Sequence, residues 1–263
     1  MSFIDSHCHL DFGQLAGCFS EILSNARRNN VIEFVVPSIS IENIPKVIKL
    51  AGDHEFIHMA LGLHPCFMDL HLASHIDQLD QLVELNRPIA IGEIGLDFYI
   101  SVDQQQQQKQ LMLFAEQLQL AQRYDLPVIL HVRKAHDQVL ALLKKHKFYT
   151  AGIVHAFNGS FVQAKRYTDE FGFKLGFGGA ITHSRALKLR ALVSQLPLTD
   201  IVLETDAPDM PIANMQQAYN QPANIKQISE VVFELRSEPA IEIERQIESN
   251  TRQILGLITS SNG

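Results

Sequence analysis

The sequence of 263 residues contains no run of about 18 apolar residues, the length that a membrane-spanning helix requires. Its richest apolar stretch, residues 56–67, is interrupted by His58 and His64. The first ten residues lack Lys and Arg and include Asp5, a composition that does not suit a secretory signal peptide. We therefore expect neither a membrane segment nor an export signal.

Cysteine is scarce, since the chain contains only Cys8, Cys18 and Cys66. They form no CxxC motif and no even-numbered disulfide framework, so we expect a reducing, cytoplasmic location. Basic residues are also outnumbered, with 22 Lys and Arg against 29 Asp and Glu and a net charge of −7. A dedicated binder of duplex DNA usually has a basic face, so strong nonspecific binding to duplex DNA is not expected.

The abundant residue types indicate a folded protein with a metal site. Hydrophobic residues make up 46% and charged residues 19%, a composition that supports a sizeable core and does not suit a disordered chain. The 12 histidines favour a site of imidazole and carboxylate ligands. Four of them fall in predicted loops or helices and are expected to be exposed: His54, His136, His146 and His183.

Short apolar runs rich in β-branched residues alternate with segments of helical periodicity. Eight strands are predicted, near residues 3–7, 33–38, 56–61, 89–93, 128–131, 152–155, 174–177 and 201–204. They recur about every 28 residues, the length that a strand and its crossover helix require. Helical spacing is clear in residues 111–121 and in residues 225–235. The glutamine run 104–108 is predicted to be the solvent-exposed start of the first of these helices. The pattern predicts one α/β domain over residues 1–263, a (β/α)₈ TIM barrel.

Residues that commonly bind metals lie at the carboxyl ends of the predicted strands, where such barrels carry their chemistry. The set consists of His7, His9, Glu93, His131, His155 and Asp206. His7 and His9 are two residues apart and should face the same side, with Cys8 facing the other. Each residue alone has an ordinary structural explanation, but their common position favours a metal site.

Four further positions are candidates near this site. His64 follows the third strand, where a substrate contact and a role in loop structure are both open. Arg133 follows His131 by two residues and could contact a phosphate or pair with a carboxylate of the barrel. Glu204, and more weakly Asp5, could hold the metal ligands in position without binding the ion themselves. The glycines of the GFGG stretch, residues 176–179, lack dinucleotide-binding spacing and are expected to relieve crowding.

Several stretches together resemble the TatD family of metal-dependent hydrolases almost from end to end. They are FIDSHCHLDF (3–12), GLHP (62–65), IGEIGLDFY (91–99), LPVILHVRKAH (126–136), VHAFNGS (154–160), LETDAPDMP (203–211) and NTR (250–252). The resemblance implies an amidohydrolase-type barrel that binds one or two divalent cations through His7, His9, Glu93, His131, His155 and Asp206. It also implies hydrolysis of ester bonds, with 3′-to-5′ deoxyribonuclease activity as the specific expectation.

Two segments depart from the family pattern. Where many members have an RNEP-like stretch, this chain has Tyr219, Asn220, Gln221 and Pro222, and so lacks an Arg and a Glu. Lys134 occupies a position that is often acidic. Since the implied ligands are unchanged, these departures concern substrate preference rather than metal binding.

A pair of cations would explain how an acidic protein handles a phosphodiester, because the ions neutralise the substrate and lower the pKa of water. We expect Glu93 to bridge the ions, with His7, His9 and Asp206 on the first and His131 and His155 on the second. Asp206 would take the proton of the attacking water. This ligand set suits Zn²⁺, Mn²⁺, Fe²⁺ or Ni²⁺, whereas Mg²⁺ would bind weakly to the imidazoles.

The expected partner is a small or single-stranded phosphodiester, including DNA ends, with no membrane and no obligate protein partner. Two other functions are open at this point. Amidohydrolase-type barrels with similar ligands also cleave cyclic amides and lactones. A metal-stabilised barrel could instead serve as a non-catalytic adaptor, which would not need Asp206 as a base.

Overall fold

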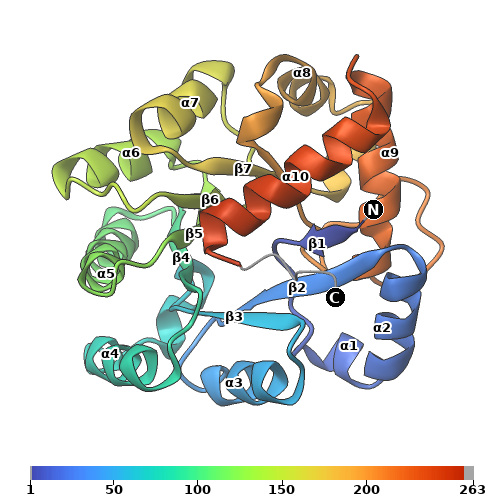
Figure 1. The fold of residues 1–263 in the computed structure, drawn as a ribbon. Coiled ribbons are helices and arrows are strands. Elements are labelled where there is room, and N and C mark those ends of the chain that lie inside the picture. Colours follow the sequence, from blue (N-terminus) through green and yellow to red (C-terminus); the bar gives the residue numbers. More distant parts are fainter. Residues whose placement is uncertain (1, 258–263) are drawn as a thin grey trace. The chain divides into compact units, whose positions relative to one another are not determined.

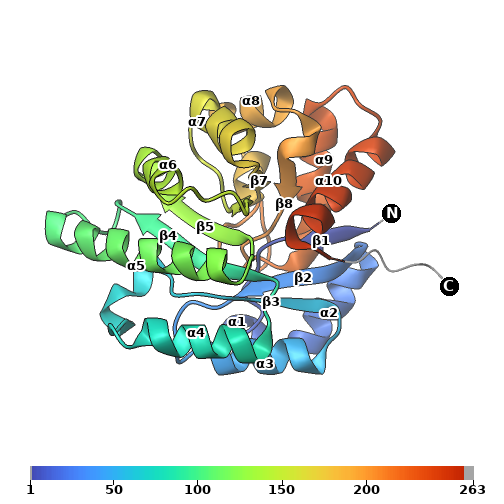
Figure 2. The same ribbon diagram turned by 60° about the vertical axis from the view of Figure 1, so that its left-hand side comes forward.

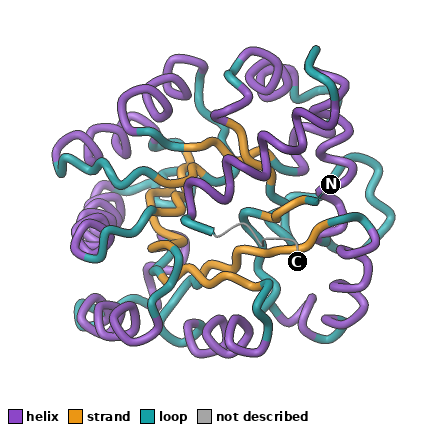
Figure 3. Tube along the Cα trace, in the orientation of Figure 1, coloured by secondary structure: helices purple, strands orange, loops and turns teal. Residues whose placement is uncertain are grey.

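The computed structural model describes residues 2–257, in which strands and helices alternate along the chain (Figures 1 and 3). Eight strands lie in the sheet in chain order. They are β1 (Phe3–Asp5), β2 (Val31–Pro37), β3 (Ile57–Leu61), β4 (Ala90–Asp97), β5 (Val128–Arg133), β6 (Gly152–Val154), β7 (Lys174–Phe177) and β8 (Ile201–Leu203). All eight predicted strands are therefore confirmed, with ends that differ by a few residues.

The chain divides into two compact units. Unit 1 comprises Met1–Val35 and Lys174–Gly263, and unit 2 comprises Val36–Phe173. The predicted single domain of residues 1–263 includes Met1 and residues 258–263, which lie outside the described residues, and it stays a prediction. No helix within residues 2–257 combines the length and the apolarity that a membrane crossing requires.

In unit 1, β1 pairs with β2 and β7 pairs with β8, both in parallel. Its helices are α1 (Gly13–Ala16), α2 (Phe19–Arg28), α8 (Leu187–Gln195), α9 (Ile225–Leu235) and α10 (Ala240–Leu255), with 3₁₀ turns at Gly179–Thr182, Leu198–Asp200 and Pro222–Asn224. The helix predicted over residues 225–235 is thus confirmed. In α10, Asn250 Nδ2 donates to the carbonyl of Ile201 at 2.7 Å, and Arg252 pairs with Glu33 of β2 at 2.5 Å.

In unit 2, β3, β4, β5 and β6 pair in parallel. Its helices are α3 (Ile44–Asp53), α4 (His75–Asn86), α5 (Gln104–Arg123), α6 (His136–Lys145) and α7 (Phe161–Lys165), with a 3₁₀ segment at Pro65–Leu70 and a π-helical turn at Arg166–Glu170. Helix α5 packs against β4 (Figure 2). It begins at the exposed glutamine run, as predicted, with Asp103 accepting from the backbone N–H of Gln106.

Close strand contact in unit 2 explains why glycine occurs in the middle of β4. Gly95 has φ +139°, and a Cβ there would overlap the carbonyl oxygen of His131 on β5. Only glycine fits both the backbone conformation and the space. This close approach brings β4 and β5 together where they carry Glu93, Asp97 and His131.

Candidate metal centre

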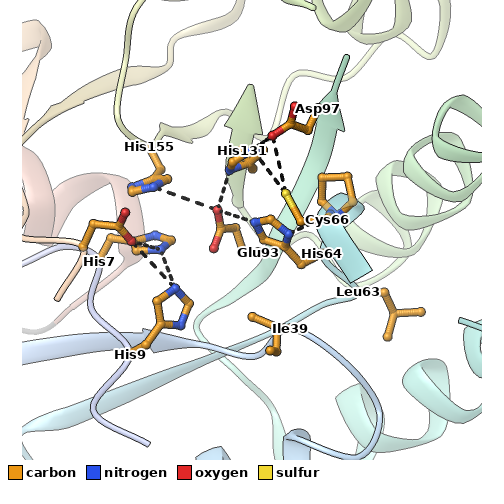
Figure 4. Close-up of polar contacts among 12 residues, drawn as sticks. His7, His9, Ile39, Leu63, His64, Cys66, Glu93, Asp97, His131 and His155 are labelled. Carbon is orange, nitrogen blue, oxygen red and sulfur yellow. Dashed lines mark hydrogen bonds and ion pairs between the residues drawn. The ribbon is translucent and has the colours of Figure 1, made fainter. Parts of the chain in front are cut away.

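In unit 1, three of the predicted ligands lie together. His7 and His9 follow β1 and face each other, with their Nε2 atoms 3.3 Å apart (Figure 4). Oδ1 of Asp206, just after β8, lies 3.6 Å from His7 Nε2 and 3.8 Å from His9 Nε2. The two histidines are buried and Asp206 is partly exposed. Two imidazole nitrogens and one carboxylate oxygen within 4.8 Å of one another fit a single divalent cation.

The backbone around this cluster is held by Asp5. Its Oδ1 accepts from the Thr205 N–H at 2.9 Å, and its Oδ2 accepts from the Thr205 hydroxyl at 2.5 Å. The N–H of Asp206 in turn donates to the carbonyl of His7 at 2.9 Å. Burial raises the pKa of Asp5 to about 7, although the hydrogen bonds from Thr205 and His7 oppose the rise. Asp5 therefore joins the two segments that carry the unit 1 ligands, and its role in supporting a metal ion stays a prediction.

In unit 2, one carboxylate oxygen is faced by three imidazoles. Oε1 of Glu93 lies 3.0 Å from His64 Nε2, 3.1 Å from His131 Nδ1 and 4.0 Å from His155 Nε2 (Figure 4). Glu93, His64 and His155 are buried. The predicted ligands of unit 2 therefore lie close together. His64 joins them, and its Nδ1 also accepts from the backbone N–H of Cys66 at 3.0 Å, so it contributes to loop structure as well.

Asp97 and Cys66 are site residues that the sequence analysis missed. Asp97 Oδ2 lies 3.0 Å from His131 Nε2, and Cys66 Sγ lies 3.4 Å from the same oxygen. Burial acts to raise the pKa of Asp97, but hydrogen bonds from His131 and two backbone amides outweigh it and lower the pKa to about 2. Burial raises the pKa of the Cys66 thiol. The alternation of side chains along a strand could have revealed Asp97, since it is four residues after Glu93.

The remaining candidates have structural partners of their own. The guanidinium carbon of Arg133 lies 3.8 Å from the centre of the exposed Tyr99 ring. Glu204 is fully buried, and a Cβ at Gly176 would overlap its Oε2. A Cβ at Gly179 would likewise overlap the carbonyl oxygen of Met210. The prediction that these glycines relieve crowding is confirmed, while the supporting role of Glu204 stays a prediction.

The expectation that His136 is exposed is wrong. His136 begins α6 and is buried, because its Nε2 lies 3.1 Å from Asn158 Oδ1 and its Nδ1 lies 3.3 Å from the Tyr167 hydroxyl. The other three histidines of that group are partly exposed. Sequence position alone does not reveal such a pairing, since Tyr167 lies 31 residues away.

The stretch that departs from the family pattern contains one retained residue with a clear structural role. Asn220 is buried, and its Nδ2 donates to the carbonyls of Thr205 at 2.8 Å and Met210 at 2.9 Å. Its Oδ1 accepts from Asn224 Nδ2 at 2.7 Å. Asn220 therefore closes the loop that carries Asp206. Its two neighbours in the sequence, Tyr219 and Gln221, are the positions that depart from the family pattern.

Comparison with known proteins agrees with this geometry. Residues 4–256 match the family model described as "TatD related DNase". An uncharacterized metal-dependent hydrolase of Escherichia coli K12, YjjV, is 43% identical over 95% of this chain and 96% of its own. The crystal structure of YjjV superposes with a TM-score of 0.90 over 96% of this chain and 97% of that one. A Pantoea ananatis protein named "3'-5' ssDNA/RNA exonuclease TatD" is 29% identical over 97% of this chain and 99% of its own. The predicted (β/α)₈ fold class is confirmed.

Proposed function

The chain belongs to the TatD family of metal-dependent hydrolases, and from that premise we propose that it is a phosphodiesterase that acts on the 3′ ends of single-stranded DNA. The observation that carries the proposal is the clustering of imidazole and carboxylate donors at the strand ends of each unit. The Pantoea relative, whose name specifies a 3′-5′ exonuclease, supports the choice of bond and polarity. The net charge of −7 supports a chain end over a duplex interior, because a rigid duplex requires a broad basic face.

The residues of both units suit divalent cations. His7, His9 and Asp206 would hold one ion, and Glu93, His131 and His155 would hold a second. Such ions, when bound, neutralise phosphate charge and lower the pKa of water. The nitrogen-rich donor set favours Zn²⁺, Mn²⁺, Fe²⁺ or Ni²⁺ over Mg²⁺.

The side chains also suit the proton and substrate steps. The Asp206 side chain is 15% exposed, more than those of His7 and His9, so it can accept the proton of an attacking water. Arg133 supplies a positive charge at the end of β5. Its guanidinium group lies over the Tyr99 ring, and its N–H groups would donate to a phosphate oxygen of the substrate. His64 is proposed as a further contact to substrate. We propose a cytoplasmic location and no obligate protein partner.

A substrate panel tests the proposal. The metal-free protein is incubated with Zn²⁺, Mn²⁺, Fe²⁺, Ni²⁺ or Mg²⁺ and offered linear single-stranded DNA, closed circular duplex DNA, lactones and cyclic amides. We expect metal-dependent release of nucleotides from the 3′ ends of the single strand and none by Asp206→Asn. Faster cleavage of closed circles would rule out a preference for chain ends, and faster hydrolysis of lactones or cyclic amides would replace the proposal with another bond class. If the Asp206→Asn protein keeps its full function in the cell, the result would favour a non-catalytic adaptor.

A further inference from the structure

In unit 2, the carboxylate of Asp97 lies beside the proposed metal ligands but is not one of them. We propose that Asp97 is the positioning residue of this centre. It holds His131 in the tautomer that carries its proton on Nε2, so that Nδ1 is the atom available to a metal ion. The inference rests on the proposed metal centre and goes beyond it, because it specifies which nitrogen binds and what orients the ring.

The His131 ring lies between two carboxylates. Asp97 Oδ2 is 3.0 Å from Nε2, and Glu93 Oε1 is 3.1 Å from Nδ1, on the other side of the ring (Figure 4). An ionised carboxylate only accepts hydrogen bonds, so each ring nitrogen of His131 can donate to the carboxylate that it faces. Glu93 is a proposed metal ligand and Asp97 is not, so a cation held by Glu93 would take the place of the proton on Nδ1, beside the oxygen that His64 and His155 also approach. The Nε2–H group would then remain as the donor to Asp97. Metal-binding histidines commonly donate their second N–H to such an outer carboxylate.

Asp97 is itself immobilised, which suits it to orienting another residue. It is buried, and its Oδ1 accepts from the backbone N–H groups of Tyr99 at 2.9 Å and Ile100 at 3.1 Å. Its own N–H donates to Gln110 Oε1 at 2.8 Å. With Oδ1 occupied by the turn, Oδ2 remains directed at His131. The same carboxylate therefore ties the orientation of His131 to the loop that carries Tyr99.

A purely structural role for Asp97, limited to holding that loop, makes a different prediction. Asp97→Asn keeps the volume and an oxygen that can accept from the loop amides, but it removes the anionic acceptor for Nε2. If Asp97 serves only the loop, this variant should bind metal as the wild type does. If it orients His131, the variant should lose metal affinity while keeping its fold.

The experiment measures Zn²⁺ affinity and stoichiometry by competition with a chromophoric chelator, for the full chain without substrate. The matched control is Asp103→Asn, which removes the same charge six residues away and leaves a side chain that still caps α5. We expect Asp97→Asn to bind one Zn²⁺ about 10- to 100-fold more weakly than the wild type. Asp103→Asn should match the wild type, and thermal unfolding should show that all three chains fold.

Histidine ¹⁵N NMR of the wild type gives an independent measurement that needs no variant. On addition of Zn²⁺, the Nδ1 resonance of His131 should shift as a metal ligand while Nε2 keeps its proton. Zn²⁺ bound at Nε2, or unchanged affinity in Asp97→Asn, would overturn the inference and leave the proposed function intact. A wild-type protein that binds no divalent cation would overturn both.

Discussion

Asp5 and Thr205 lie 200 positions apart in the chain, yet Thr205 donates hydrogen bonds to both carboxylate oxygens of Asp5. The N–H of His7 donates to the same side chain at 3.3 Å. One buried acidic residue thus holds three donors on the segments that lead into His7 and Asp206. The placement of the unit 1 ligands depends on this residue, although it is not itself among them.

Asp5→Ala should therefore destabilise the protein. It leaves the Thr205 N–H, the Thr205 hydroxyl and the His7 N–H without their acceptor, and each such buried group costs roughly 1–3 kcal/mol. We expect the free energy of unfolding, measured in urea without metal, to fall by at least about 2 kcal/mol. Asp5→Asn retains an accepting oxygen and serves as the control, with a loss of less than about 1 kcal/mol. Equal losses in the two variants would show that hydrogen bonding at Asp5 is not the cause.

Gly176→Ala should test the buried position of Glu204. The added Cβ overlaps Glu204 Oε2, and overpacking of this kind costs about 1–3 kcal/mol. A second substitution, Glu204→Ala, removes the obstacle, so the double variant should lose less stability than the two single effects combined. Gly52→Ala is the matched control, because nothing lies within 4 Å of its Cβ and it occupies a helix. Additive losses in the double variant would argue against direct contact.

The strands could be predicted because their apolar runs are short, regularly spaced and separated by helical periodicity. Their ends were less accurate: β1 ends at Asp5, before His7, while β4 continues to Asp97. The grouping of candidate ligands within each unit could still be predicted, because it depends on the end of the sheet at which the residues lie and not on the last residue of each strand. His7 and His9 converge even though they follow the strand.

The finer organisation of the centre could not be read from the sequence. His64 was predicted only as a substrate or loop residue, and its approach to Glu93 depends on the turn that Cys66 helps to form. Asp97 escaped notice because a carboxylate at a strand end commonly has an ordinary structural role. In both cases the partner is set by side-chain conformation between strands, which a one-dimensional pattern does not encode.

Arg133→Ala should weaken binding of charged substrates. A lost charge-assisted contact of about 1.5–3 kcal/mol corresponds to roughly a 10- to 100-fold fall in kcat/KM for single-stranded DNA. If Arg133 binds ground state and transition state alike, the fall appears in KM with kcat unchanged. Tyr99→Leu, which removes the ring beneath the guanidinium, should have a smaller effect in the same direction. A neutral ester substrate is the control, and an equal loss of its hydrolysis would refute a phosphate contact.

Glu93→Gln and Asp206→Asn should differ in whether added metal restores activity. The amide side chain introduced by Glu93→Gln keeps the volume and one accepting oxygen but lacks the negative charge of a carboxylate ligand. His7, His9 and Asp206 would still hold the first ion, whereas His131 and His155 alone are too few for a firm second site. Activity of Glu93→Gln should therefore fall steeply and recover in part at high metal concentration. Asp206→Asn should not recover, because it loses the proposed proton acceptor as well as a ligand. Metal stoichiometry and activity are measured side by side, and two tightly held ions in Glu93→Gln would rule out Glu93 as a required metal ligand.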